Sequence, residues 1–293
     1  MRWYHASFSR GEDRKESAPQ LCPWCSSHRF VRNGVKANGL QNYKCSACER
    51  QFTPRSGSFW AGMRYPQQII LGCVALKFIG RASYQACLTL LEVLRGAHVG
   101  STNTAWQWVQ KCETAFETVH RSYRKSYGRL SWRVDEIFCR CRGSTSKRGH
   151  AYIIVVSDNK SNILAIEVST KRDTHAVERT LAKIVDEEAR DPKFFVSDKW
   201  KPYRETIGFN FPNTTNVATG IRGKTVHRKR KRYRFTINPH ERLNGTIQSW
   251  LRPMKGFKSL ESANRMMNMY RICHTTKRQM GHVEFFGRLA SLP

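Results

Sequence analysis

The spacing of apolar residues changes along the chain and marks out its parts. Residues 1 to about 20 are polar and without a period, so we predict a mobile tail there. Over residues 60–126 the apolar positions recur at the three- and four-residue steps of helices. Short β-branched runs typical of strands begin after residue 129, and helical spacing returns after residue 237. The pattern therefore predicts a multidomain α/β protein.

Three short helices are predicted in the first helical stretch. Pro66–Phe78 forms the first, and Ser83–Leu94 the second, with Ser83 as its cap. The third opens near Ser101 or Thr102, after two glycines. Helices of this length favour a helix-turn-helix unit over residues 60–126, although a plain helical bundle with a solvated polar face gives the same pattern.

The third helix carries the candidate DNA contacts of this unit. Its packing side is predicted to include Ala105, Trp106, Val109 and Cys112. The residues predicted to point outward are Asn103, Gln107, Gln110 and Lys111. Amides and a cation placed in this way can contact base edges or phosphates in the major groove of DNA.

An α/β domain is predicted over residues 129–280. Its first strands form a meander of three runs, Trp132–Cys141, Ala151–Ser157 and Asn162–Val168. A helix then begins at Asp173 and Thr174 and reaches about Ala189, and Lys193–Ser197 reads as a fourth, fully buried strand. The order β-β-β-α-β-α is that of a layered domain.

The stretch Ile237–Leu260 predicts the helix that follows, with Asn238 as N-cap and Pro239 at the first helical position. Its buried face is predicted to consist of Leu243, Ile247, Trp250, Leu251 and Met254. Its polar face is predicted to carry Glu241, Asn244, Gly245 and Gln248. A further helix, Ser259 to about His274, should cover the sheet.

Charge is the main feature of the composition. The chain has 51 Lys and Arg against 22 Asp and Glu, a net charge of +29, which favours nucleic acid as its partner. A membrane surface is the rival partner, but the longest apolar run, Ile69–Leu76, suits a buried helix. The N-terminal residues do not resemble a secretory signal, so we expect a cytoplasmic, nucleoid-associated protein with reduced thiols.

Four of the ten cysteines have the spacing of zinc ligands. CPWC at residues 22–25 and CSAC at residues 45–48 are two CxxC pairs separated by nineteen residues. Asn33-Gly34 and Asn38-Gly39 are predicted to be hairpin turns between them. The alternative is four unrelated buried thiols. We predict a zinc ribbon over residues 21–57, in which Cys22, Cys25, Cys45 and Cys48 bind one structural Zn²⁺ and leave no open ligand position.

Three carboxylates have positions that suit a catalytic metal site. Asp135 lies within the first predicted strand and Asp198 directly after the fourth, so both can lie near one sheet edge while Glu241 approaches from a helix. Hard oxygen ligands of this kind suit Mg²⁺. Two ions held together can clamp the attacking and leaving oxygens of a phosphoryl transfer. For Glu241 alone, a capping box at the helix start is the plain structural alternative.

Two further acidic residues are possible decoys for this set. Glu136 follows Asp135 directly and should point to the opposite face of the sheet, because strand side chains alternate. Asp158 lies in the predicted turn Ser157–Lys160 and reads as a turn residue.

A basic run separates Asp198 from Glu241. Residues 222–234 hold eight Lys and Arg among thirteen residues. Such a run is usually a solvated, mobile loop. Its place between two candidate ligands favours a role in gripping DNA phosphates, and the residues concerned are Arg228, Lys229, Arg230, Lys231 and Arg232.

Several of these segments match a known family. VDE at 134–136, KRDT at 171–174, SDKWKPY at 197–203 and HERLNGTIQSWLRPMKGFKS at 240–259 resemble the DDE transposases of prokaryotic insertion sequences, especially the insertion sequence six family. The resemblance covers roughly residues 60–276. Two features depart from the family pattern: the stretch between Asp198 and Glu241 is longer, and Gln248 stands where a basic residue is often found.

The resemblance implies an RNase H-like catalytic domain in which Asp135, Asp198 and Glu241 bind two Mg²⁺ ions, with Mn²⁺ as a substitute. It also implies cleavage and strand transfer at the ends of a DNA element, a helix-turn-helix that recognises terminal inverted repeats, and homo-oligomers that bring two ends together. Two alternatives stay open. One is a zinc-ribbon and helix-turn-helix regulator without catalytic activity, and the other is an RNase H-like nuclease that cuts without joining.

Overall fold

The computed structural model describes residues 19–37, 39–123, 126–142, 149–185, 191–220 and 222–292. Most of the predicted tail and Asn38 of one predicted turn lie outside the described residues. The chain divides into two compact units, one formed by Met1–Ala115 with Phe286–Pro293 and the other by Phe116–Phe285. No described helix is both long and apolar enough to span a bilayer.

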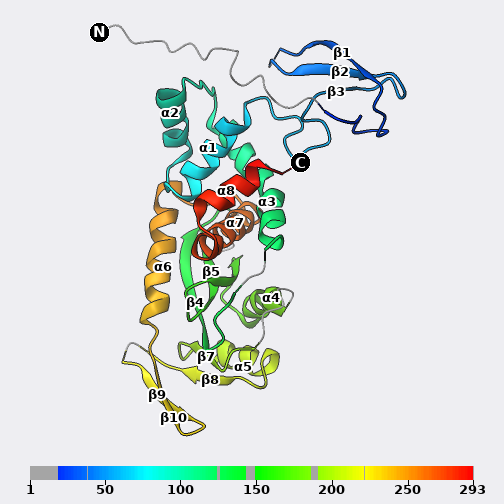
Figure 1. Cartoon of the computed structure of the whole chain (residues 1–293). Coiled ribbons are helices and arrows are strands. Elements are labelled where there is room, and N and C mark those ends of the chain that lie inside the picture. Colours follow the sequence, from blue (N-terminus) through cyan, green and yellow to red (C-terminus); the bar gives the residue numbers. More distant parts are fainter. Residues whose placement is uncertain are drawn as a thin grey trace. The chain divides into compact units, whose positions relative to one another are not determined.

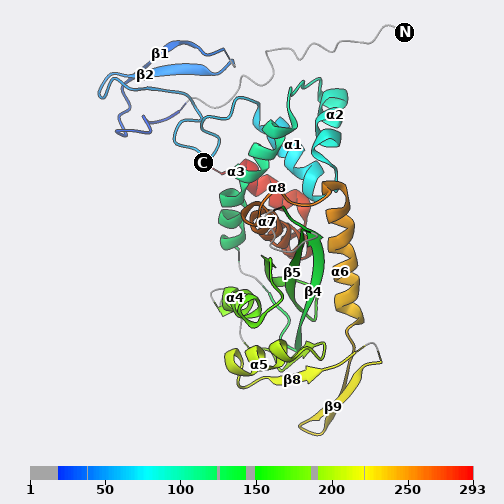
Figure 2. The ribbon, with the colours of Figure 1, turned by 180° about the vertical axis from the view of Figure 1, so that it is seen from behind.

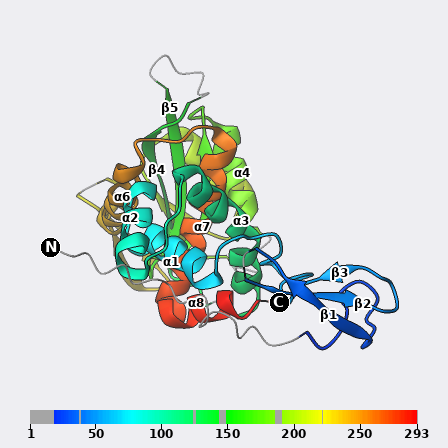
Figure 3. The same cartoon turned by 90° about the horizontal axis from the view of Figure 1, so that it is seen from above.

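The first unit begins with a small antiparallel sheet, blue in Figures 1 and 3. Its strands are β1 (Phe30–Val35), β2 (Gln41–Cys45) and β3 (Gln51–Phe52), in the order β1-β2-β3. Aromatic residues of all three strands pack edge-on or stacked, together with three of the predicted zinc ligands. This core is small, so a bound metal would add much of its stability.

One predicted turn of this sheet is wrong. Gly34 lies inside β1, where the pairing with β2 shifts register between Arg32 and Val35. Its φ of +71° is the left-handed conformation that glycine adopts without strain. The Asn33-Gly34 pair therefore forms a bulge within the strand rather than the turn of a hairpin.

Three helices follow, as predicted: α1 (Gln67–Phe78), α2 (Tyr84–Arg95) and α3 (Thr102–Arg121). The Ser83 side chain accepts a hydrogen bond from the Ala86 amide at 3.1 Å, and Gly96 ends α2 in the left-handed conformation. In α3, Ala105, Val109 and Cys112 are buried as predicted. Trp108 is buried as well and Trp106 only half-buried, so the packing face includes a position that the prediction omitted.

The second unit is built on a five-stranded sheet in the order β6-β5-β4-β7-β8. Its strands are β4 (Ser131–Arg140), β5 (His150–Asp158), β6 (Ile163–Ser169), β7 (Phe194–Ser197) and β8 (Thr215–Ala218). The antiparallel meander β4-β5-β6 and the buried fourth strand are confirmed, and β7 and β8 run parallel to β4. The strand β8 was not predicted from the sequence.

Helices cover this sheet, as Figures 1 and 2 show. α4 (Thr174–Val185) and α5 (Lys201–Asn210) pack on the face that carries Trp132 and Val134 of β4. The last residues predicted for α4 lie outside the described residues, and α5 was not predicted. α6 (Asn238–Leu251) runs beside β4, and a short 3-10 helix η2 (Arg252–Met254) extends it.

α7 (Leu260–Gln279) lies along the edge strand β6. The Asn264 side chain brackets the backbone of Val168, and the Thr275 hydroxyl does the same for Ile163. Polar side chains of α7 thus satisfy backbone groups that an edge strand leaves unpaired. The final helix is α8 (His282–Ala290).

The basic run is a β-hairpin rather than a mobile loop. β9 (Lys224–Arg228) pairs with β10 (Lys231–Phe235), and Lys229 and Arg230 form the turn with φ of +49° and +61°. Tyr233 and Phe235 pack on Phe194 of β7. The hairpin was missed because its turn lacks the Asn-Gly or Asp-Gly pair that favours positive φ at both positions.

Candidate active site

The four predicted zinc ligands converge. The sulfur atoms of Cys22, Cys25, Cys45 and Cys48 all lie within 4.8 Å of one another. Each CxxC motif contacts the other twice: the sulfur atoms of Cys22 and Cys48 are 3.7 Å apart, and those of Cys25 and Cys45 are 3.6 Å apart. The backbone N–H of Cys48 helps to lower the pKa of the Cys45 thiol to about 6, whereas burial and the neighbouring thiols raise the pKa of Cys25. The donor set fits a structural Zn²⁺.

Asp135 lies in the middle of β4, on the face covered by α6. Its Oδ2 accepts a hydrogen bond from Nδ2 of Asn244 at 2.9 Å. Burial raises the pKa of Asp135 to about 7, and the nearby charges of Glu136 and Asp198 add to this effect. Asn244 is itself buried, which corrects the prediction that it lies on the face opposite the buried one.

Asp198 follows the last residue of β7, which pairs in parallel with the start of β4. The register aligns Val196 with Arg133, so Asp198 reaches the level of Asp135. Its Oδ1 accepts a hydrogen bond from the backbone N–H of Trp200 at 2.8 Å, which fixes the direction of the carboxylate. Two residues far apart in sequence are therefore brought to the same level of the sheet, where β7 ends beside the central strand β4.

Glu136 joins this pair. As predicted, it uses the other face of β4: its carboxylate accepts a hydrogen bond from the Tyr203 hydroxyl of α5 and forms an ion pair with Arg172. Nevertheless, carboxylate oxygens of Asp135, Glu136 and Asp198 all lie within 4.8 Å of one another. The alternation of strand side chains predicts that Glu136 and Asp135 point to opposite faces. It does not predict that their carboxylate oxygens still lie close to each other and to Asp198.

Arg172 supplies the positive charge of this cluster. One of its terminal nitrogens contacts Glu136 and lies 3.7 Å from Oδ2 of Asp198. The guanidinium stacks over Trp200, 4.3 Å from the ring centroid. Arg172 belongs to the segment KRDT of the family pattern, and its ion pair gives this segment a physical role.

Glu241 lies at the start of α6. The N-cap is Ile237 rather than Asn238, so Asn238 and Pro239 occupy the first two helical positions. Because isoleucine has no side-chain acceptor, the capping-box explanation of Glu241 fails. His240, whose Nδ1 is 2.9 Å from the Ser157 hydroxyl, anchors this turn to β5. Burial lowers the pKa of His240 to about 3, so this anchor is neutral.

The Glu241 side chain is exposed and is not part of the carboxylate cluster found among the described residues. Asn244, three residues further on, occupies the position next to Asp135. Residues at this spacing share one side of a helix, so Glu241 lies on the side of α6 that faces the cluster. The structure brings Asp135 and Asp198 together and leaves Glu241 one turn away.

Asp158 has the structural role that was predicted for it. Its carboxylate accepts hydrogen bonds from the backbone N–H groups of Gly128, Lys160 and Asn162 and from the Asn162 side chain. All its acceptor capacity is used within the β5–β6 turn and its surroundings. It is therefore no candidate metal ligand.

A comparison of the sequence with protein families decides the assignment. Residues 129–280, more than half of the chain, match the model of a transposase family of the IS240 type, and this model describes a DDE domain. The chain belongs to the IS240/IS6 family of DDE transposases. Its second unit is thus an RNase H-like, integrase-type catalytic core, preceded by a helical region and a four-cysteine cluster that fits a zinc ribbon.

Solved structures similar to this DDE transposase include two retroviral proteins and one transpososome. The HTLV-2 integrase catalytic core with magnesium is 12% identical over 45% of this chain and 74% of that chain, with a TM-score of 0.31. The simian T-cell lymphotropic virus intasome is 13% identical over 69% of this chain and 63% of that chain, with a TM-score of 0.32. The Mos1 pre-cleavage transpososome is 11% identical over 72% of this chain and 78% of that chain, with a TM-score of 0.29. No protein of curated function matches the chain. The family assignment rests on the sequence match.

The predicted DNA contacts of this DDE transposase lie on two surfaces. Asn103, Gln107 and Lys111 are exposed on α3, whereas Gln110 is half-buried. On the hairpin, the exposed residues are Lys229, Arg230, Lys231 and Arg232. Arg228 differs from them, because its guanidinium packs over Phe194 and donates a hydrogen bond to the Lys193 carbonyl.

Proposed function

We propose that this chain cleaves DNA at the ends of a mobile element and joins the freed 3′ ends to target DNA. The observation that carries the proposal is the convergence of Asp135 and Asp198 where β7 ends beside β4, next to the helix that carries Glu241, in a chain of the DDE transposase family. Hydrolysis and joining are both phosphoryl transfers at one site, with water as the nucleophile in the first and a DNA 3′-hydroxyl in the second.

Asp135, Asp198 and Glu241 would hold two Mg²⁺ ions, or Mn²⁺ in their place. The residue types fit, since all three side chains are carboxylates and none is a thiol or an imidazole. Bound there, the ions would stabilise the charge on the attacking and leaving oxygens. Asn244 and the Trp200 amide orient Asp135 and Asp198, and Glu241 would complete the set by a small movement of the first turn of α6.

Glu136 and Arg172 would act on the site without contacting substrate. Glu136 is 9% exposed and is held by both Tyr203 and Arg172, so its charge is already compensated. Arg172 in turn balances Asp198. We assign Glu136 to positioning Arg172 and Arg172 to offsetting the repulsion among the carboxylates before metal binds.

DNA would be held by the other elements. In this proposal α1–α3 form a helix-turn-helix that recognises terminal repeats through Asn103, Gln107 and Lys111. The hairpin would grip phosphates through Lys229, Arg230, Lys231 and Arg232, with Arg228 mainly supporting the hairpin on β7. The zinc ribbon would add a further DNA-binding module, and two or more copies of the chain would bring two element ends together.

A strand-transfer assay with labelled element ends and Mg²⁺ tests the proposal. Asp135→Asn, Asp198→Asn and Glu241→Gln should each abolish cleavage while DNA binding is kept. Glu261→Gln, which removes an exposed carboxylate of α7, is the matched control and should cleave normally. Binding without cleavage by the unaltered protein would favour the regulator alternative, and free ends without joined products would favour the nuclease.

A further inference from the structure

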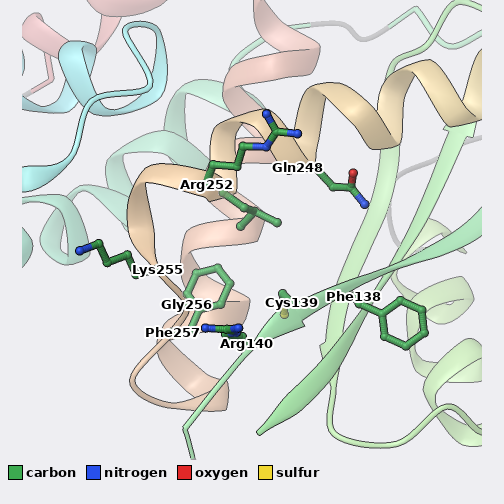
Figure 4. A pocket seen from close by; sticks show the side chains of 9 residues that line it. Phe138, Cys139, Arg140, Gln248, Arg252, Lys255, Gly256 and Phe257 are labelled. Carbon is green, nitrogen blue, oxygen red and sulfur yellow. The ribbon is translucent and has the colours of Figure 1, made fainter. Parts of the chain in front are cut away.

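A cleft lies between the last turn of α6 and the end of β4 (Figure 4). Its volume is about 520 Å³. Gln248 and Arg252 line it from the helix, and Cys139 and Arg140 line it from the strand. Lys255 also lines it, and no acidic residue contributes to its walls.

One wall of the cleft is fixed by backbone pairing. The amide of Phe257 donates a hydrogen bond to the carbonyl of Arg140 at 2.8 Å, and the amide of Arg142 donates one to the carbonyl of Phe257 at 2.9 Å. Gly256 has a φ of +107°, and a Cβ there would lie 2.8 Å from the Arg140 carbonyl oxygen. The chain after α6 is thus held against β4 by these hydrogen bonds, so this wall of the cleft has a fixed position.

Positive charge gathers on both sides of this wall. A second cleft, of about 390 Å³, shares Arg140 and Lys255 with the first and adds Arg142 and Lys258. Arg252 of the first cleft brings the number of cations around this wall to five. All five are exposed, and none of them is ion-paired within the described part of the chain. Five uncompensated charges around a fixed groove repel one another, and a polyanion would relieve that repulsion.

The cleft continues the polar side of α6 that begins at the carboxylates. Asn244 contacts Asp135, Gln248 lies one turn further along the helix at the rim of the cleft, and Arg252 lies one turn beyond. Residues four apart on a helix lie on one side of it, so these three side chains form one row along α6. Arg252 and Lys255 therefore supply the positive charge that Gln248 lacks.

We propose that this cleft binds the phosphodiester backbone of a DNA strand as the strand leaves the carboxylate site. The inference rests on the proposed function for the identity of the polyanion. The contacts are to phosphates and carry no base specificity, so they serve any sequence. Arg140, Arg252 and Lys255 hold the strand, and Gln248 contributes a neutral hydrogen-bonding group nearest to the carboxylates.

The experiment is the salt dependence of DNA binding, measured without added Mg²⁺ or Mn²⁺ so that no cleavage occurs while the zinc of the ribbon is kept. Arg252→Gln with Lys255→Gln should lower the slope of log affinity against log salt by about 2, since each lost phosphate contact removes about 0.9. The loss should be equal for an element end and for a duplex of arbitrary sequence. Arg252→Lys with Lys255→Arg should keep the slope.

Lys277→Gln with Arg278→Gln is the matched control, because it removes the same charge from two exposed residues of α7. This control should keep the wild-type slope. An unchanged slope in the cleft variant, or an equal fall in the control, would overturn the assignment. Because binding is measured without catalysis, a failure of the proposed cleavage reaction would leave this result readable: the slope would still report whether the cleft holds phosphates.

Discussion

Removing Arg172 should strengthen the binding of a divalent metal ion at the carboxylate cluster. Arg172 lies 3.7 Å from Oδ2 of Asp198 and is ion-paired with Glu136. Any metal ion bound by Asp198 must compete with this guanidinium. Arg172→Gln removes the competitor and leaves all the carboxylates in place, so the affinity for a divalent ion should rise.

The size of the effect follows from the distance. At 3.7 Å the attraction between two unit charges is about 1 kcal/mol in water and about 4–5 kcal/mol at an effective dielectric constant of ~20. The side chains of Arg172 and Asp198 are 33% and 35% exposed, so the lower part of this range applies. A change of about 1.4 kcal/mol corresponds to about tenfold tighter binding.

The assay is calorimetric titration of the whole protein with Mn²⁺ or Ca²⁺ in the absence of DNA. Glu136→Gln should have the opposite effect and weaken binding, because Arg172 then retains Asp198 as its partner and one nearby negative charge is lost. Adding Arg172→Gln to that variant should recover much of the affinity. Arg179→Gln is the control, since it breaks the comparable ion pair with Glu167 on α4 and β6. If Arg172→Gln binds Mn²⁺ no more tightly than the wild type, the competition does not exist.

Three further outcomes are expected. The pKa of Asp135 is raised from 3.8 to about 7, so the metal-free native state holds a proton that the unfolded state releases. The free energy of unfolding should therefore fall as pH rises from about 4 to about 7. Chemical denaturation at several pH values should show a smaller fall in Asp135→Asn, and an equal fall in the variant and the wild type would refute the shift. Metal analysis should find one zinc per chain, lost in Cys22→Ser and kept in Cys139→Ser, a half-buried cysteine outside the cluster; zinc in neither the wild type nor the control would contradict the ribbon. Gly256→Ala should lower the free energy of unfolding by about 1–3 kcal/mol, because its φ of +107° and the nearby Arg140 carbonyl exclude a side chain; thermal unfolding at the wild-type midpoint would refute the tight pairing of this segment.

Strong local patterns made most of the fold predictable. The β-branched runs of β4, β5 and β6 appear within one or two residues of their predicted bounds, because each is long enough to show its period. α5 and β8 were missed since both are short and mix polar with apolar residues. The hairpin β9–β10 was missed because its apolar side consists only of Val226, Tyr233 and Phe235, hidden among eight basic residues.

The candidate site was predictable only in part. Asp135 and Asp198 could be paired because a residue within one strand and a residue after a shorter, neighbouring parallel strand can reach the same level of the sheet. Glu136, Arg172 and Tyr203 could not be joined from sequence, because their contacts connect β4, the loop after β6 and α5. The buried position of Asn244 depends on how α6 is rotated against β4, which hydrophobic spacing defines only approximately.

The central claim is that Asp135, Asp198 and Glu241 share the catalytic metal ions, and anomalous diffraction from Mn²⁺ in a crystal of the protein bound to an element end tests it most directly. The account predicts manganese held by Asp135, Asp198 and Glu241, with Glu136 still bound to Tyr203 and Arg172. Manganese held by Asp135, Glu136 and Asp198, with Glu241 remaining in solvent, would contradict it.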